Sequence, residues 1–177
     1  SGYLNQRRVL STAGKIALQS PLRKTETYTS TDFQDPNQAP NDLRVAEAYS
    51  TAQKKRQISI RHPVFKLAPQ VQEKNVRGQL FRLNSLTPIF YETMLRSAGA
   101  DALDQTPQEQ ETLILDSGVP IVWAFVATET GVHCAYPGKG GYEPDYDPRI
   151  RPWYIQAKGQ KDPVCGKPYE DKMGQGL

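Results

Sequence analysis

Residues 136–154 decide the fold of this chain and read YPGKGGYEPDYDPRIRPWY. This stretch contains four Pro, three Gly, four Tyr, one Trp and two Arg, and it follows the most apolar run of the chain, residues 119–127. Pro and Gly at this density fix the backbone in defined turns. A rigid loop that carries aromatic and cationic side chains can grip a small molecule. We therefore predict that residues 136–154, called the lip below, border a ligand pocket that the rest of the chain supports.

Length and charge narrow the class of protein. A chain of 177 residues is long enough for one hydrophobic core and too short for two of ordinary size. The net charge is +3 and the Lys and Arg residues are scattered, which argues against a nucleic-acid partner because phosphate backbones are tracked by basic stripes. No apolar run approaches the roughly 18 residues of a membrane span. The polar opening, SGYLNQRR, does not have the pattern of a signal peptide.

Cysteine and histidine are too sparse for a metal or cofactor prediction. Cys134 and Cys165 lack CxxC spacing, and His62 and His133 are the two histidines of the chain. This pattern argues against zinc, and we expect no cofactor. A disulfide between the cysteines and a pair of free thiols both remain open.

Catalytic motifs are also missing from the sequence. It has no GxSxG, HExxH or P-loop pattern. His133 and Cys134 cannot form a dyad if they lie on one strand, because adjacent side chains point to opposite faces. We expect a protein that is not an enzyme.

The first part of the chain, residues 1–110, is expected to be mainly helical. Apolar spacing predicts a helix over 2–20 that ends at Pro21, followed by a polar connector over 25–40. A second helix is predicted from Asp42, as its cap, towards residue 60. Two more are predicted over 64–83 and 85–97, with a polar loop over 100–110.

Residues 111–177 change to an extended pattern that includes the lip. Strands are predicted over 111–116, 119–127 and 132–136, the last two joined as a hairpin by the turn at 129–131. A short helix over 153–158, closed by Gly159, and a strand over 164–170 follow. The order predicts one α+β domain, an antiparallel sheet with the N-terminal helices packed on one face. Because this sheet is thin, we expect the domain to be incomplete and truncated at its C-terminus.

The lip carries a family resemblance. Tyr136-Pro137-Gly138, the YDPR of residues 146–149 and the RPWY of residues 151–154 resemble the double Cache family of extracytoplasmic sensor domains. The KPYED of residues 167–171 resembles that family's PYxD segment. The resemblance is strong over 119–177 and rests on pattern alone in the helical part.

The resemblance implies an architecture and a location. It implies a PAS-like antiparallel sheet with a long N-terminal helix, forming the membrane-distal module of a bacterial transmembrane receptor. The parent protein would be anchored in the inner membrane, with this module outside the cytoplasm, periplasmic or extracellular. A homodimer through the N-terminal helix is also expected.

A ligand site comes from the same resemblance. Many members bind small organic molecules, and one subset binds the amino and carboxyl groups of amino acids. The matching positions here are Tyr146, Arg151, Trp153, Tyr154, Tyr169 and Asp171. Arg151 offers a planar fork of donors for a carboxylate, and Asp171 suits an ammonium group. The tyrosine rings attract a cation through their π faces.

Three of these residues also have a plainer interpretation. Trp153 is equally well explained as core, because large aromatics bury more area than other residues. Arg151 could pair with Asp145 or Asp147 across the turn. Tyr169 could be an ordinary half-buried strand residue. The hypothesis is thus a small-molecule sensing domain, with amino acids or related amines and carboxylates as ligands; the rivals are a Cache-like scaffold without a ligand and an unrecognised enzyme.

Overall fold

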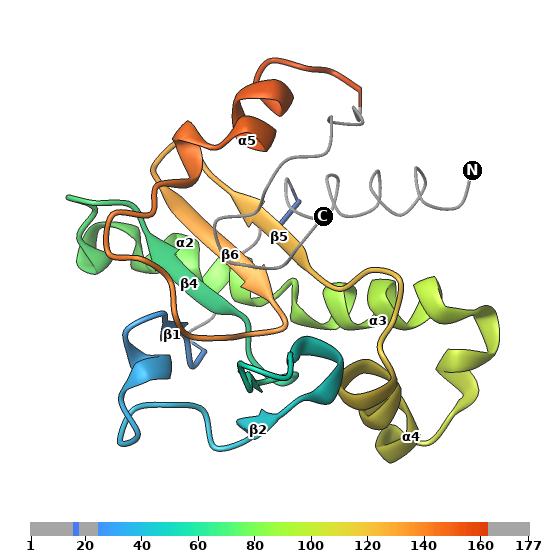
Figure 1. Ribbon diagram of the computed structural model, residues 1–177. Coiled ribbons are helices and arrows are strands. Elements are labelled where there is room, and N and C mark those ends of the chain that lie inside the picture. The colour runs from blue at the N-terminus through green and yellow to red at the C-terminus, as the bar shows by residue number, and fades with distance from the viewer. Residues whose placement is uncertain (1–15, 18–24, 163–177) are drawn as a thin grey trace.

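The computed structural model describes residues 16–17 and 25–162, and within them the fold is α+β (Figure 1). Its centre is a four-stranded mixed sheet with the strand order β1-β4-β6-β5, and a separate two-stranded sheet pairs β2 with β3. The strands are β1 Tyr28–Thr29, β2 Arg44–Val45, β3 Gln57–Ile58, β4 Val64–Leu67, β5 Ala124–Ala127 and β6 Val132–Tyr136.

Four α-helices lie in the described ranges: α2 Glu73–Asn84, α3 Thr87–Ala98, α4 Pro107–Thr112 and α5 Pro152–Ala157. Shorter helical turns lie elsewhere along the described chain: η1 Asp32–Gln34, η2 Glu47–Tyr49, η3 Ala100–Asp104, the π-helical turn η4 Leu113–Ser117 and η5 Pro148–Ile150. None of the helices in these ranges is long and apolar enough to cross a membrane.

The predicted hairpin is confirmed. β5 and β6 pair antiparallel, with Phe125 opposite Ala135 and Ala127 opposite His133. Gly131 adopts φ +86° in the connecting turn, a conformation that residues with a side chain rarely adopt. The helices predicted over 85–97 and 153–158 are likewise present as α3 and α5, and Gly159 follows α5 with φ +80°.

The prediction of a purely antiparallel sheet is wrong. β1 runs parallel to β4, with Tyr28 opposite Val64 and Thr29 opposite Phe65, and the Ser30 amide extends the pairing to the Phe65 carbonyl at 2.8 Å. The polar connector therefore supplies an edge strand. Parallel pairing is open to it because the long excursion between β1 and β4 returns the chain to the same end of the sheet.

The helix predicted from Asp42 to residue 60 is also wrong. The Asp42 carboxylate accepts hydrogen bonds from the Ser59 hydroxyl at 2.8 Å and from the Arg61 amide at 3.0 Å, instead of capping a helix. Its partners lie far along the chain, so the local cap signal is overridden. The segment forms η2 and the β2–β3 pair, in which Arg44 lies opposite Ile58.

Three neighbouring predictions need correction. Residues 64–83 are not one helix: β4 occupies Val64–Leu67 and α2 begins only at Glu73. The loop predicted over 100–110 contains η3 and the start of α4, where Thr106 and Glu109 form a reciprocal capping box. Residues 111–116 are helical instead of extended, and Leu115 is buried there.

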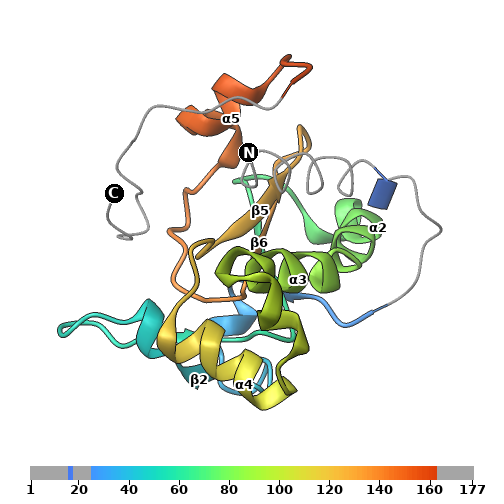
Figure 2. The same ribbon diagram turned by 90° about the vertical axis from the view of Figure 1, so that its right-hand side faces the viewer.

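β6 is the central wall of the domain because all five of its residues are buried. Tyr136 faces the helices, stacks on Phe90 of α3 at 5.8 Å between ring centroids and donates a hydrogen bond to the Ile60 carbonyl at 2.7 Å. His133 and Ala135 face the opposite way, towards the lip. Figure 2 shows α2 and α3 on one side of the sheet and the lip, in orange, on the other.

Several sequence predictions fall outside the described residues. They include most of the helix over 2–20, the strand over 164–170 and Cys165 with its disulfide alternative. Cys134 is a buried free thiol on the helix-facing side of β6.

Candidate functional site

The lip is fastened to the sheet along its length. Gly138 exchanges two backbone hydrogen bonds with Ser59, each 2.9 Å long. A Cβ atom at Gly138 would collide with the His62 carbonyl oxygen and the Phe33 ring, so only glycine fits. Further along, the ammonium group of Lys66 on β4 donates to the Pro144 carbonyl at 3.0 Å. The lip therefore lies close against β4 and β6 (Figure 1).

A bidentate ion pair braces the end of the lip. The Arg149 guanidinium contacts the Asp147 carboxylate at 2.9 Å from Nε and 2.7 Å from Nη2. These hydrogen bonds hold the pKa of the Asp147 carboxyl below its ordinary value. Arg149 also lies over the β5–β6 turn, where its Cζ atom would be 3.2 Å from a Cβ added to Gly131. The pair thus connects the lip to the hairpin.

Beneath the lip, aromatic rings surround His133. Its ring centroid lies 5.3 Å from that of Tyr146, 5.5 Å from Phe125, 5.8 Å from Tyr142 and 5.9 Å from Trp153. We call these five residues the aromatic cluster. Phe125 is 40% exposed, so the cluster reaches the surface beside β5.

His133 is 4% exposed, and its Nδ1 atom has no hydrogen-bond partner among the described residues. Burial, and to a smaller degree the nearby Lys139 ammonium group, lower the pKa of His133 to about 3. The ring is therefore neutral at physiological pH. A buried, neutral imidazole with an unused nitrogen is able to hydrogen-bond to a guest molecule.

Two other nitrogen-bearing side chains lie beside the cluster. Lys139, 5% exposed, places its ammonium group 5.1 Å from the ring centroid of Trp123 and 5.5 Å from that of Tyr142. Trp123 also packs on Tyr49 at 5.0 Å, and its buried Nε1 atom has no hydrogen-bond partner in the described part of the chain. An indole N–H can only donate, so this one is available to an acceptor.

The four predicted site residues within the described ranges come from the lip and α5. Tyr146 is 8% exposed and contacts His133, and Trp153 contacts both His133 and Phe125, the latter at 4.7 Å. Tyr154 packs edge-on against Trp153 at 5.9 Å. Trp153 is only half-buried, so it lines the cluster and is not core alone.

Arg151 does not pair with Asp147, because Arg149 occupies that carboxylate. Its Nε atom is buried and has no hydrogen-bond partner among residues 25–162. The plain ion-pair interpretation of Arg151 is therefore wrong for Asp147. Tyr169 and Asp171, the remaining two predicted residues, lie outside the described residues.

The sequence analysis missed His133, Lys139, Trp123, Phe125 and Tyr142 as neighbours of the site. Strand alternation carries part of the signal, because residues 133 and 135 must face away from residues 132, 134 and 136. The choice between the two faces depends on which one the lip covers, and that requires the tertiary structure.

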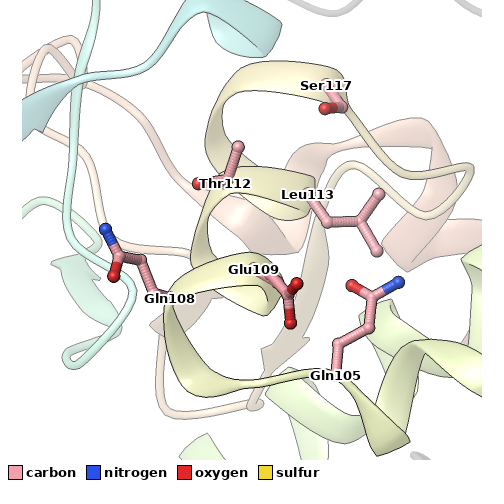
Figure 3. A pocket seen from close by; sticks show the side chains of 6 residues that line it. All are labelled: Gln105, Gln108, Glu109, Thr112, Leu113 and Ser117. Atoms are coloured by element: carbon pink, nitrogen blue, oxygen red, sulfur yellow. The ribbon is translucent and has the colours of Figure 1, made fainter.

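A separate hollow of about 410 Å³ lies on α4, at the end of the molecule opposite α5 (Figures 1 and 2). Figure 3 shows its largely polar lining and its single apolar side chain, Leu113. It is wide open to solvent. In the described ranges, no group of three or more His, Cys, Asp and Glu residues could hold a metal ion.

Comparison of the sequence with models of protein families gives no match, and comparison with curated proteins gives none either.

Proposed function

We propose that this chain is a small-molecule sensing domain whose ligand binds between the lip and the lip-facing side of the sheet. The observation that carries the proposal is the set of three buried nitrogens without partners in the described residues: His133 Nδ1, Trp123 Nε1 and Arg151 Nε. Buried polar atoms in native proteins are almost always hydrogen-bonded, so unpaired ones point to a missing partner. His133 lies on β6, Trp123 directly precedes β5, and Arg151 belongs to the lip.

The resemblance of the lip to the double Cache family suggests the kind of receptor and its cellular location. A double Cache module with a PAS-like sheet would sit outside the cytoplasm as the membrane-distal part of a bacterial receptor. The α+β fold and the helical layer on one sheet face are compatible with that architecture. Amino acids and related amines or carboxylates are the ligands that Arg151, Tyr146 and Tyr154 favour on chemical grounds.

Signalling would use the attachment of the lip to the sheet. A ligand that contacts both the lip and β6 stabilises the conformation in which the two are held together. The difference in its binding free energy between that conformation and others sets the size of the signal. The N-terminal segment, expected as a long helix, would receive the signal in the whole protein.

Calorimetric titration of the 177-residue chain with a panel of amino acids, amines and carboxylates tests the proposal. We expect saturable binding by at least one member and a loss of roughly tenfold or more in affinity in Arg151→Ala, because a charge-assisted bidentate bond is removed. Arg96→Ala is the matched control: Arg96 pairs with Glu92 on α3, on the other side of the sheet. If no panel member binds, the scaffold alternative takes precedence.

A further inference from the structure

The turn that joins β5 to β6, residues 128–131, is held by contacts from both faces of the sheet. In Figures 1 and 2 the tip of this hairpin lies between α2 and α5. Gly131 has φ +86° and little space around it. A Cβ atom added there would lie 2.9 Å from the Ala68 Cβ and 3.2 Å from both the Val71 side chain and the Arg149 Cζ. The turn is therefore packed against the β4–α2 connection and against the lip at the same time.

On the helix side, the turn is attached to α2 by hydrogen bonds. The Thr130 hydroxyl donates to the side-chain oxygen of Gln79 at 2.7 Å. The Thr128 hydroxyl lies 2.7 Å from the Thr130 hydroxyl and 3.2 Å from the same Gln79 oxygen, so its proton can serve either acceptor. The Ala68 amide donates to the Gly131 carbonyl at 2.8 Å. A shift of the turn would therefore break or lengthen bonds to α2 and to the connection before it.

On the lip side, the Arg149 guanidinium lies over Gly131 while it forms its bidentate pair with Asp147. The Asp147 carboxylate also accepts from the Arg149 amide at 2.9 Å, so it holds both the guanidinium and the backbone of η5. From α5, the Lys158 ammonium lies 3.3 Å from the Glu129 carboxylate, but these side chains are 62% and 76% exposed and such a pair contributes little. We therefore attribute the attachment of the lip to the turn mainly to Arg149.

We propose that the β5–β6 turn couples the lip to α2, so that loosening of the lip also loosens the helix on the opposite face of the sheet. The contacts run around the end of the hairpin, from Asp147 and Arg149 to Gly131 and then through Thr130 to Gln79. This inference goes beyond ligand binding and does not require it, because every contact lies within the chain. Coupling between two sites is reciprocal, so a change at Gln79 must also loosen the lip.

Amide hydrogen exchange of the 177-residue chain, followed by mass spectrometry, tests both directions of the coupling. Arg149→Met removes the guanidinium and keeps an aliphatic stem, and we expect the amides of α2 to exchange about threefold or more faster while those of α3 change much less. Gln79→Met removes the acceptor on α2 and should accelerate exchange in residues 145–151 by a similar factor. Arg77→Met is the matched control, because Arg77 also lies on α2 but pairs with Glu73 of the same helix, and it should leave exchange in the lip unchanged.

Urea unfolding of the two single variants and of the double variant gives a second measurement. Gln79 and Arg149 contact different residues of the turn, so without coupling their effects on the unfolding equilibrium constant would multiply. We expect the combined effect to be smaller than that product by about threefold or more, because loss of either contact already frees the turn. Asp147→Asn replaces Arg149→Met if the latter does not fold. Multiplicative effects, or exchange in α2 that is unchanged or accelerates only as much as in α3, would overturn the coupling whether or not a ligand binds.

Discussion

Acidification should destabilise this protein through His133. The pKa of the folded ring is lowered from the ordinary value of 6.5 to about 3, mainly by burial. Because the pKa of this histidine is lower in the folded state, the unfolded chain binds a proton at pH values where the folded chain does not. The stability from this residue is therefore fully present above pH 6.5 and is lost as the pH falls towards 3.

The size of the effect follows from that shift. Each pH unit below 6.5 removes about 1.4 kcal/mol while the folded ring stays neutral. Between pH 7 and pH 5 the free energy of unfolding should fall by about 2 kcal/mol, a large part of the stability of an ordinary domain. Paired carboxylates such as Asp147, whose pKa is lowered, titrate in a more acidic range and contribute little in this window.

Urea unfolding at pH 7, 6 and 5, followed by tryptophan fluorescence, measures the effect. The variant His133→Leu removes the titrating ring, so its free energy of unfolding should change much less between pH 7 and pH 5 than that of the original chain. His62→Gln is the control for the other histidine, which packs against Tyr28 at 4.8 Å, and it should retain the pH dependence. Parallel pH profiles for the original chain and His133→Leu would refute the reasoning.

Three further substitutions test the anchoring of the lip, each by equilibrium unfolding. Gly138→Ala should cost about 1–3 kcal/mol because the new Cβ meets the His62 carbonyl and the Phe33 ring, while Gly140→Ala, with no contact closer than 3.3 Å, should cost less. Tyr136→Phe should cost about 1 kcal/mol, since the hydrogen bond to Ile60 is lost; an unchanged midpoint would contradict that bond. Asp147→Asn should cost about 0.5–1 kcal/mol, a small value because the Arg149 side chain is 38% exposed, and a loss above 3 kcal/mol would show that the pair is more than a surface brace.

The second part of the described chain was predictable because its signals are local. Gly131 sets the hairpin turn, β-branched and aromatic residues mark β5 and β6, and Pro152 begins α5 at its first position, where the missing N–H is harmless. The lip was recognisable by composition and spacing. These features depend on neighbours within a few residues, which the sequence displays directly.

The errors in the first part arise from partners distant in sequence. Asp42 has the chemistry of a helix cap, yet Ser59 and Arg61 take its carboxylate. Val64–Leu67 forms β4 and pairs with β6. The apolar spacing of so short a segment does not distinguish a strand from part of a helix. The capping box of Thr106 and Glu109 is a local signal for the start of α4 within the segment that was predicted as a loop.

The candidate site was predicted only in part for the same reason. The lip residues Tyr146 and Trp153 pack around a single ring on the sheet, and Tyr154 packs on Trp153. That ring, His133, belongs to a strand, and it meets the lip because it occupies the face of β6 that the lip covers. Trp123, which lies beside Lys139 of the lip, comes from the segment before β5. The sequence pattern of the lip alone does not show that the lip packs against β6 and the segment before β5.

The burial of β6 on both faces has a consequence for how the protein can change over evolutionary time. Exposed strand positions usually accept polar replacements with little effect, but Val132–Tyr136 contains no such position. A substitution on the face of β6 that contacts Phe90 requires a compensating change in the helices. A substitution on the face that contacts Tyr146 requires one in the lip. A substitution within Val132–Tyr136 therefore needs a compensating change in the helices or in the lip, whichever layer its side chain contacts.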